Sequence, residues 1–169
     1  MPPIWPRVQG VFPRSAQRGT EDSITLAGRN LQGGNGLLFT SAIITARIVH
    51  STPLEVKAVV SVKPDAEPGR HDLRLLAGHG SALAYFDVGT VPERNEKDPN
   101  SSASQVEALQ MPLLINGVIP SGDYDYFRFD AAAGETLTFD LQATRLGAST
   151  DAVLSVLNEA GEEIAYSDD

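Results

Sequence analysis

The stretch that decides the fold runs Gly122-Asp123-Tyr124-Asp125-Tyr126-Phe127-Arg128-Phe129-Asp130, then Ala131-Ala132-Ala133-Gly134-Glu135, then Thr136-Leu137-Thr138-Phe139-Asp140-Leu141. Residues 126–129 and 136–141 alternate apolar with polar side chains, which is the period of a β-strand. The loop between them contains Gly134, as a tight turn requires. We therefore predict a β-hairpin with a buried face of Phe127, Phe129, Leu137, Phe139 and Leu141, and a wet face of Arg128, Asp130, Thr138 and Asp140.

The rest of the chain repeats short runs of strand-forming residues between turns, and it contains no convincing helix. Turn signals recur every eight to twelve residues, as in a small immunoglobulin-like sandwich. In the first half we predict seven strands, at 7–12, 23–28, 37–39, 43–49, 54–62, 71–76 and 82–88. Beyond the hairpin, the second half adds strands at 113–119, 152–157 and 163–166. The fold class that follows is all-β, with two β-sandwich modules.

Length and charge predict two domains joined by a linker. At 169 residues the chain is long enough for two domains of about 80 residues each. Residues 1–91 carry nine Lys and Arg against seven Asp and Glu, a net charge of +2, whereas residues 92–169 carry four against fifteen, a net charge of −11. Polar, turn-rich residues follow this change of charge. We therefore predict domains at 1–91 and 106–169, with an acidic linker at 92–105.

The same composition excludes several classes of function. Because the chain has no cysteine, it has neither disulfides nor thiolate metal sites. No apolar run approaches the roughly 20 residues of a membrane-spanning helix, so we expect no membrane insertion. The first six residues have no signal-peptide character, so the chain is either intracellular or an excerpt of a longer precursor. An acidic second half repels phosphate backbones and attracts divalent cations, so we expect no nucleic-acid partner.

The first half contains four groups of residues whose order along the chain is typical of a known domain. They are Pro13 with Gly19, then Ile24-Thr25-Leu26-Ala27-Gly28-Arg29-Asn30-Leu31, then Pro68-Gly69-Arg70-His71-Asp72-Leu73, then Ser81 with Phe86-Asp87-Val88. In this order they resemble the IPT/TIG domain, which has a proline–glycine opening, a strand ending in Gly-x-Asn-Leu and a final Phe-x-Val. The resemblance covers half of the chain. It implies an immunoglobulin-like sandwich used for interaction or spacing, without catalysis.

The second half carries a longer set of residues in a fixed order. They are Glu96-Lys97-Asp98-Pro99-Asn100, Asn116-Gly117-Val118-Ile119, Asp123-Tyr124-Asp125-Tyr126-Phe127-Arg128-Phe129, Ala133-Gly134-Glu135, Asp151-Ala152-Val153-Leu154, Gly161 and Asp168-Asp169. Together they resemble the bacterial pre-peptidase C-terminal (PPC) domain, a module of secreted peptidases and collagenases. The resemblance implies a jelly-roll-like sandwich. Since family members continue past the paired aspartates, it also implies a truncated module within a larger exported protein of planctomycete type.

The strongest candidate for a functional site is a calcium site, formed by several carboxylates and one side-chain amide. Glu96, Asp98 and Asn100 present oxygens at every second position, and Asp123 and Asp125 repeat this spacing. Calcium takes six to eight oxygen ligands of these kinds. The PPC resemblance implies that Glu96, Asp98, Asn100 and Asp125 bind calcium together, although Asp98 stands where the family has a longer glutamate. The alternative is a solvated acidic linker that ends in an Asp-Pro turn, and both interpretations stay open.

The other polar candidates do not have the sequence patterns of metal or catalytic sites. His50, His71 and His79 lack the spacing of metal ligands and have no acidic or serine partner nearby, which is typical of surface or turn histidines. Asp123 and Asp125 have the spacing of two aspartates on one exposed strand, which rarely enclose a substrate and so do not favour an acid/base pair.

Three aromatic residues leave a further alternative open. Trp5, Tyr124 and Tyr126 could form a binding face for a peptide or a glycan, or cover the ends of the two cores.

The function predicted from the sequence is therefore recognition. We expect a non-catalytic binding or spacer segment of an exported bacterial protein, found outside the cell, on its surface or in the periplasm. It would serve targeting, adhesion or folding assistance, with calcium as its cation. Its partners would be a protein or polysaccharide surface and the rest of a larger parent chain. The alternative is an accessory region of a secreted, peptidase-like hydrolase whose catalytic domain lies outside these residues.

Overall fold

A computed structural model of the chain describes residues 5–120, 122–143 and 152–168. The chain divides into two compact units. The first comprises Met1–Lys97 with Gln110–Gly117, and the second comprises Asp98–Leu109 with Val118–Asp169. Residues 110–117 belong to the first unit, although the sequence analysis assigns them to the second domain.

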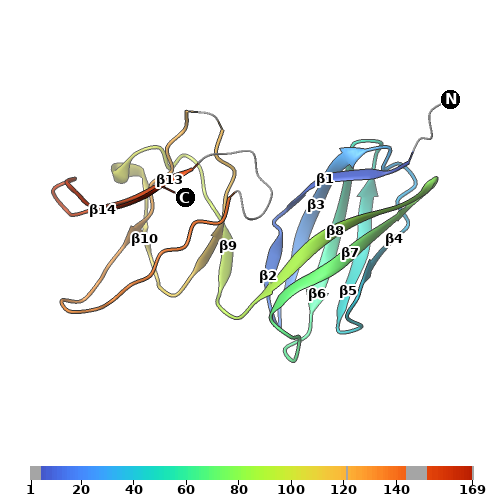
Figure 1. Cartoon of the computed structure of the whole chain (residues 1–169), viewed down its shortest axis with the longest axis horizontal. Coiled ribbons are helices and arrows are strands. Elements are labelled where there is room, and N and C mark those ends of the chain that lie inside the picture. Colours follow the sequence, from blue (N-terminus) through green and yellow to red (C-terminus); the bar gives the residue numbers. More distant parts are fainter. Residues whose placement is uncertain (1–4, 121, 144–151, 169) are drawn as a thin grey trace. The chain divides into compact units, whose positions relative to one another are not determined.

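The first unit contains a β-sandwich of two four-stranded sheets (Figure 1). One sheet has the order β1-β3-β6-β5, formed by Arg7–Phe12, Glu21–Arg29, Glu55–Val62 and Ile44–Ser51. The other has the order β2-β8-β7-β4, formed by Ser15–Gln17, Gly80–Gly89, Gly69–Ala77 and Gly36–Phe39. Neighbouring strands are antiparallel, except that β2 runs parallel to β8. The predicted all-β class is confirmed.

Alternating side chains of these strands fill the space between the two sheets. Phe86 and Phe39 meet edge to face at 5.7 Å between ring centroids, with 74° between the ring planes. Burying one such large apolar side chain contributes about 1.5–3 kcal/mol. The largest fully buried side chains are Phe86, Ile24, Leu26, Leu31, Leu73, Leu75, Val56, Val60 and Val62. The period-2 pattern thus gives the first unit a continuous apolar core.

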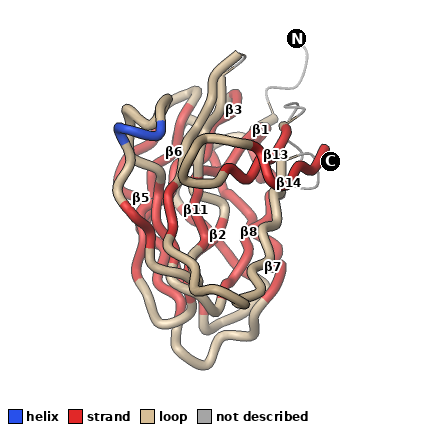
Figure 2. Tube along the Cα trace, turned by 90° about the vertical axis from the view of Figure 1, so that its left-hand side faces the viewer, coloured by secondary structure: helices blue, strands red, loops and turns tan. Residues whose placement is uncertain are grey.

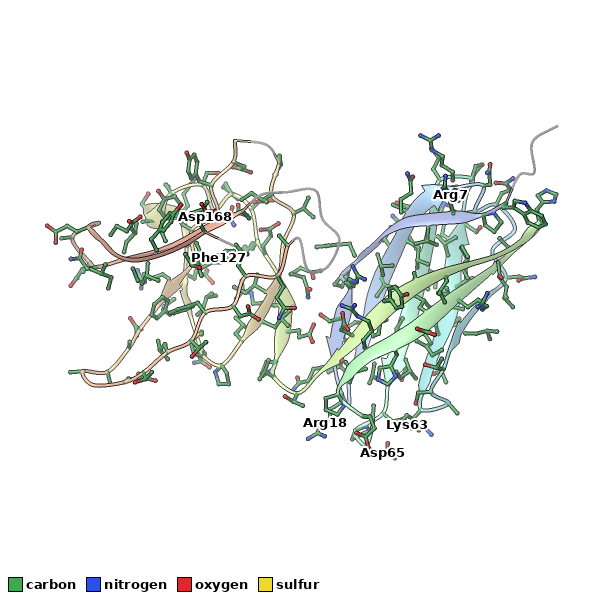
Figure 3. All side chains as sticks on the ribbon, viewed as in Figure 1. Arg7, Arg18, Lys63, Asp65, Phe127 and Asp168 are labelled. Atoms are coloured by element: carbon green, nitrogen blue, oxygen red, sulfur yellow. The ribbon has the colours of Figure 1, made fainter. Side chains whose placement is uncertain are left out.

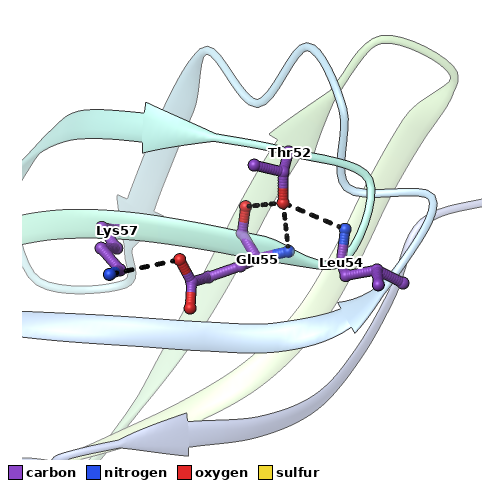
Figure 4. Close-up of polar contacts among 4 residues, drawn as sticks. All are labelled: Thr52, Leu54, Glu55 and Lys57. Carbon is purple, nitrogen blue, oxygen red and sulfur yellow. Dashed lines mark hydrogen bonds and ion pairs between the residues drawn. The ribbon is translucent and has the colours of Figure 1, made fainter.

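The turn between β5 and β6 is held by a threonine hydroxyl (Figure 4). Thr52 Oγ1 accepts hydrogen bonds from the backbone N–H of Leu54 at 3.3 Å and of Glu55 at 2.9 Å. The side chain of Glu55 then lies 3.4 Å from Lys57 Nζ. This side-chain turn fixes where β6 begins and therefore which of its residues face inward.

A short parallel strand pair completes the first unit. β9 (Glu93–Asn95) runs beside β11 (Leu114–Asn116). Backbone hydrogen bonds extend the pair at both ends, from Leu114 N to Pro92 O and from Glu96 N to Asn116 O, each at 2.9 Å. The predicted linker therefore begins as a strand.

The described residues of the second unit form two pairs of strands and one short helix. β10 (Ala108–Leu109) runs parallel to β12 (Arg128–Phe129), and β13 (Val153–Leu157) is antiparallel to β14 (Glu163–Asp168). Figure 2 shows the helix, Ala103–Gln105, among strands and loops. Within the described residues of this unit, only Asn100 and Ala152 are buried.

The prediction of a β-hairpin over residues 126–141 is wrong, because its two strands do not pair with each other. Arg128 and Phe129 pair with Ala108 and Leu109 instead, and residues 136–141 are described without a strand. A non-local partner has therefore replaced the neighbouring one. The sequence pattern cannot reveal this because it reports the period of a strand and not its partner.

Parts of the hairpin prediction nevertheless hold. Glu135 N donates to Ala132 O at 3.0 Å, and Gly134 has the positive φ of 85° that the turn needs. The Phe129 and Phe139 rings face each other with centroids 4.9 Å apart. Phe127, predicted to be buried, is 43% exposed. The turn and one aromatic contact form, but they do not enclose a core.

Candidate functional site

The end of the acidic linker lies against the segment that leads into β12. The backbone N–H of Tyr126 donates to the carbonyl oxygen of Asn100 at 2.8 Å. Asn100 is buried, at 3% exposure, whereas Asp98 is exposed and Asp125 is half-buried. The backbone bond therefore brings two groups of predicted ligands together within the second unit.

The side-chain amide of Asn100 lies between the two carboxylates. One amide atom is 3.0 Å from Asp98 Oδ1 and 3.1 Å from Asp125 Oδ1. With nitrogen at this position, the amide donates a hydrogen bond to each carboxylate. With oxygen there, three oxygens lie close together, as the ligands of a hard cation do. The same group of atoms suits either a hydrogen-bonded bridge or a cation.

The other two predicted ligands have different surroundings. Asp123 turns back on its own backbone, where its Oδ1 accepts from Tyr124 N at 2.9 Å. Glu96 belongs to the first unit, and its Oε2 would lie only 2.7 Å from a Cβ atom placed on Gly117. The structure thus brings together three of the five predicted residues, Asp98, Asn100 and Asp125.

Carboxylates alone do not make a metal centre here. Within the described parts of the chain, no group of three or more Asp, Glu or His side chains is placed to hold a metal ion. The cluster offers two carboxylates and one amide, which supply at most five oxygens if both carboxylates bind through two atoms. Water or backbone carbonyls would have to complete the six to eight ligands of calcium. The donor types fit calcium, and the binding itself stays a prediction.

The sequence analysis missed Glu93, a half-buried carboxylate in the first unit. Its Oε2 accepts hydrogen bonds from Ser15 Oγ at 2.6 Å and from Asn116 Nδ2 at 3.5 Å. Its Oε1 is buried, with no hydrogen-bond partner among the described residues. A Cβ atom on Gly89 would lie 2.5 Å from this oxygen, so the Glu93 carboxylate would have to shift if a side chain were added there. Glu93 therefore joins β9 and β11 to the end of the sandwich at β2.

The surroundings of Glu93 raise its pKa above the ordinary value. Burial is the largest cause, and the negative charges of Asp22 and Asp87 add to it. The hydrogen bonds from Ser15 and Asn116 act in the opposite direction. No sequence motif marks such a residue, because its burial depends on which strands meet.

Histidines and aromatic residues occupy separate places. His71 lies in strand β7 and not in a turn, and its Nε2 is 2.8 Å from Glu67 O. Trp5 is in the first unit and is 61% exposed, whereas Tyr124 is in the second and is 72% exposed. At these exposures neither ring covers a core. A shared aromatic binding face stays a prediction.

A family profile matches the first unit. That of the quinohemoprotein amine dehydrogenase alpha subunit domain III matches residues 5–87, just under half of the chain. The profile covers both sheets of the sandwich. It names a different family from the IPT/TIG resemblance, and the IPT/TIG and PPC assignments stay predictions.

Comparison with solved structures gives a loose likeness of fold. One is the Bacteroides ovatus SGBP-B of the mixed-linkage glucan utilization locus in complex with a mixed-linkage heptasaccharide, at 18% identity and a TM-score of 0.40. The match covers 62% of this chain and spans about a quarter of that protein, 26%. No curated protein matches the sequence. Among the described residues, no helix has the length and apolar character to cross a membrane.

Proposed function

We propose that this chain is a non-catalytic binding and spacer segment of an exported bacterial protein. Its place would be outside the cell, on its surface or in the periplasm, where it would serve targeting, adhesion or folding assistance. The immunoglobulin-like first sandwich supports the role of spacer, because its core is built without the second unit. The PPC resemblance of the second half supports export and a larger parent chain.

The observation that carries this proposal is the position of Asn100. It is buried between Asp98 and Asp125, at 3.0 and 3.1 Å, and its carbonyl accepts from Tyr126 N at 2.8 Å. A buried amide that faces two carboxylates ties the linker to the start of β12. A cation held by the same oxygens would strengthen this tie, which supports a module whose stability depends on an external cation.

Calcium is the cation that these donors favour. Asp98, Asn100 and Asp125 would hold it, with the amide turned so that its oxygen faces the carboxylates. Bound calcium would cancel the repulsion between the two carboxylates. The segment is part of a half-chain with a net charge of −11, so the local field also attracts a divalent cation.

Calorimetry with the intact chain tests the proposal. We expect the unfolding transition of the second unit to move to higher temperature in millimolar calcium and back again in excess chelator. By linkage, a ligand at one hundred times its Kd stabilises by about 2.7 kcal/mol. The transition of the first unit should not move.

A matched pair of variants makes this experiment specific. Asp125→Asn removes a proposed ligand, whereas Asp130→Asn removes the same charge from an exposed position five residues along the chain. We expect Asp125→Asn to abolish the calcium shift and Asp130→Asn to keep it. An identical melt of the unmodified chain in calcium and in chelator would remove calcium from the account.

The second candidate function is an accessory region of a larger enzyme. The specific observation in its favour is the profile match of residues 5–87 to a domain of an enzyme subunit. The peptidase-like hydrolase of the sequence analysis is one form of this candidate. Turnover of any substrate by this chain, on peptide and glycan panels, would contradict the non-catalytic proposal, whereas binding without turnover would support it.

A further inference from the structure

The outer faces of the two sheets of the first unit differ in charge. On the β1-β3-β6-β5 sheet, the outward positions follow from the register, because the inward neighbours Leu26, Ala58 and Val60 are buried. We call this outer surface the cationic face. Its positively charged or titratable residues are Arg7, Arg29, Arg47, His50 and Lys57, and its carboxylates are Glu21 and Glu55.

Two arginines stand directly opposite each other at one end of the cationic face. Arg7 of β1 is the register partner of Arg29 of β3, and both are exposed. Figure 3 shows the Arg7 side chain projecting away from the sheet. Neither forms an ion pair with a carboxylate among the described residues. Like charges in this position destabilise a sheet, so the pair gains from an added anion.

A third arginine, Arg47, lies toward the other end of the cationic face, one register row from Glu21 and Thr45. Arg47 of β5 lies opposite Val59 of β6, and Val59 in turn lies opposite Ser23 of β3. Lys57 is the one cation on this face that forms an ion pair among the described residues, with Glu55 at 3.4 Å (Figure 4). Arg47 therefore remains available to a ligand, like Arg7 and Arg29.

On the opposite sheet the exposed arginines have partners. Arg70 Nε lies 3.4 Å from Asp87 Oδ1, and its guanidinium lies 5.4 Å from the centre of the Tyr85 ring. Arg74 Nη1 donates to Ser81 Oγ at 3.0 Å. The two sheets thus use arginine differently, and only the β1-β3-β6-β5 sheet presents arginines without such partners.

We propose that the cationic face binds a linear anionic polysaccharide, one that carries sulfate or carboxylate groups. This rests on the proposed binding function and names the ligand class. Along β3, Arg29 lies six positions from Ser23, which is in the register row of Arg47. At about 3.4 Å per residue this is about 20 Å. One small anion cannot bridge that span, whereas a chain of charged sugars can.

The middle of the cationic face suits sugar rings. Ala27 of β3 points outward between Arg29 and the Arg47 row, and it lies opposite Glu55 of β6. Phe12 of β1 lies opposite Thr25, and Val59 lies in the Arg47 row itself. Ala27 is exposed, and the other two are half-buried. Small apolar surfaces of this kind contact the carbon faces of sugars while the arginines pair with the acidic groups.

The charge of the whole chain argues for a polymer of moderate charge density. The net charge is −9, and residues 92–169 carry −11 of opposing charge. Double-stranded DNA places one negative charge about every 1.7 Å and is therefore strongly repelled by such a chain. A polysaccharide with one charged group per sugar or fewer meets less repulsion and still reaches both ends of the face.

Dextran sulfate of low substitution, with one sulfate per sugar or fewer, and neutral dextran test the inference, because they share one backbone and differ in charge. We expect the intact chain to bind dextran sulfate, with affinity that falls as salt rises, and not to bind dextran. Arg7→Gln with Arg29→Gln should weaken binding at least 10-fold and lower the salt slope by about one to two, as for other polyanions that release counterions.

The control removes the same charge from the opposite sheet. Arg70→Gln with Arg74→Gln should leave the affinity for dextran sulfate within about twofold of the unmodified chain. Thermal unfolding shows whether the variants fold, and the Arg7 and Arg29 double variant should melt no lower, because a repulsive pair is gone.

Several outcomes would overturn the inference. They are equal loss in both double variants, tighter binding of single-stranded DNA than of dextran sulfate, and salt-sensitive self-association in sedimentation that accounts for the retention. Equal binding of dextran would contradict the charge argument while leaving a binding function intact. The calorimetric calcium experiment decides the proposed function separately, so the two failures can be told apart.

Discussion

The first unit buries fifteen hydrophobic side chains in one cluster, whereas the described part of the second unit buries only Ala152 and Asn100. Both units come from sequence with alternating apolar residues. In the first, two four-stranded sheets face each other and exclude water from the alternate side chains. In the second, the strands form pairs. Alternation makes strands, and a core requires a second layer against them.

The second unit depends on polar contacts and turns instead. Ile164 and Tyr166 of β14 are 65% and 57% exposed, so the β13-β14 pair leaves much of its apolar surface in water. A lone two-stranded hairpin is at best marginally stable. The buried Asn100, which lies between two carboxylates, should therefore contribute more to the stability of the second unit than a polar residue contributes to the first.

The strongest test of this contrast compares two phenylalanines. Phe86 is fully buried and Phe127 is 43% exposed. We expect Phe86→Ala to destabilise the first unit by about 3–5 kcal/mol, because it leaves a cavity. Phe127→Ala should cost about 1 kcal/mol or less in the second unit. Urea unfolding followed by amide resonances from each unit measures both, and equal losses would contradict the contrast.

Replacing Asn100 examines the polar centre of the second unit. Asn100→Ala leaves Asp98 and Asp125 without the amide between them, and should cost about 1–3 kcal/mol in calcium-free buffer. Asn95→Ala, at an exposed position of β9, is the control and should stay within about 0.5 kcal/mol. Chemical denaturation reads both. If the two variants unfold alike, the second unit does not depend on its buried amide.

A glycine substitution tests the junction of β9 with the sandwich. Gly89→Ala places a Cβ atom 2.5 Å from Glu93 Oε1, so the carboxylate must shift away from Ser15 and Asn116, which should cost about 0.5–1.5 kcal/mol. Shortening the acid with Glu93→Asp should recover part of the loss in the double variant. A double-mutant cycle measures this coupling. Additive losses would mean that Glu93 does not lie against Gly89.

The smallest expected effect is a pH dependence from Glu93. Its pKa is raised in the folded state, so the folded state holds its proton more tightly than the unfolded state. The stability contribution is present below the unfolded pKa and is lost as pH rises through the folded pKa. Glu93→Gln, which keeps the side-chain length and stays neutral, should remove this part of the slope. The free energy of unfolding is measured against pH for the unmodified chain and for Glu93→Gln. Parallel curves would show that Glu93 does not contribute to the pH dependence.

The strands of the first sandwich could be predicted because each carries its own signal. Residues 7–12 are predicted with the bounds that the structure gives, and the turns at Gly69 and Gly80 have the positive φ that favours glycine. β2 escaped prediction because three residues with only Ala16 buried show no alternation. In this unit local pattern and tertiary packing agree.

Features that depend on partners far along the chain could not be read from the sequence. Arg128 and Phe129 pair with residues twenty positions earlier, and Glu93 is buried by β2 and β11. The approach of Asn100, Asp98 and Asp125 was predictable from the PPC resemblance, and Glu96, which it also includes, belongs to the first unit. Asp151 and Asp169, which that resemblance also uses, lie outside the described residues.

Hydrogen exchange along the intact chain, in calcium and in excess chelator, tests the central contrast most directly. We predict that the amides of Ile24, Val60 and Leu75 exchange slowly and identically in both conditions, because an apolar core protects them. The Tyr126 amide, bonded to Asn100 O, should exchange much faster and slow down in calcium. Protection of Tyr126 equal to that of the first core in chelator, or unchanged by calcium, would contradict the account.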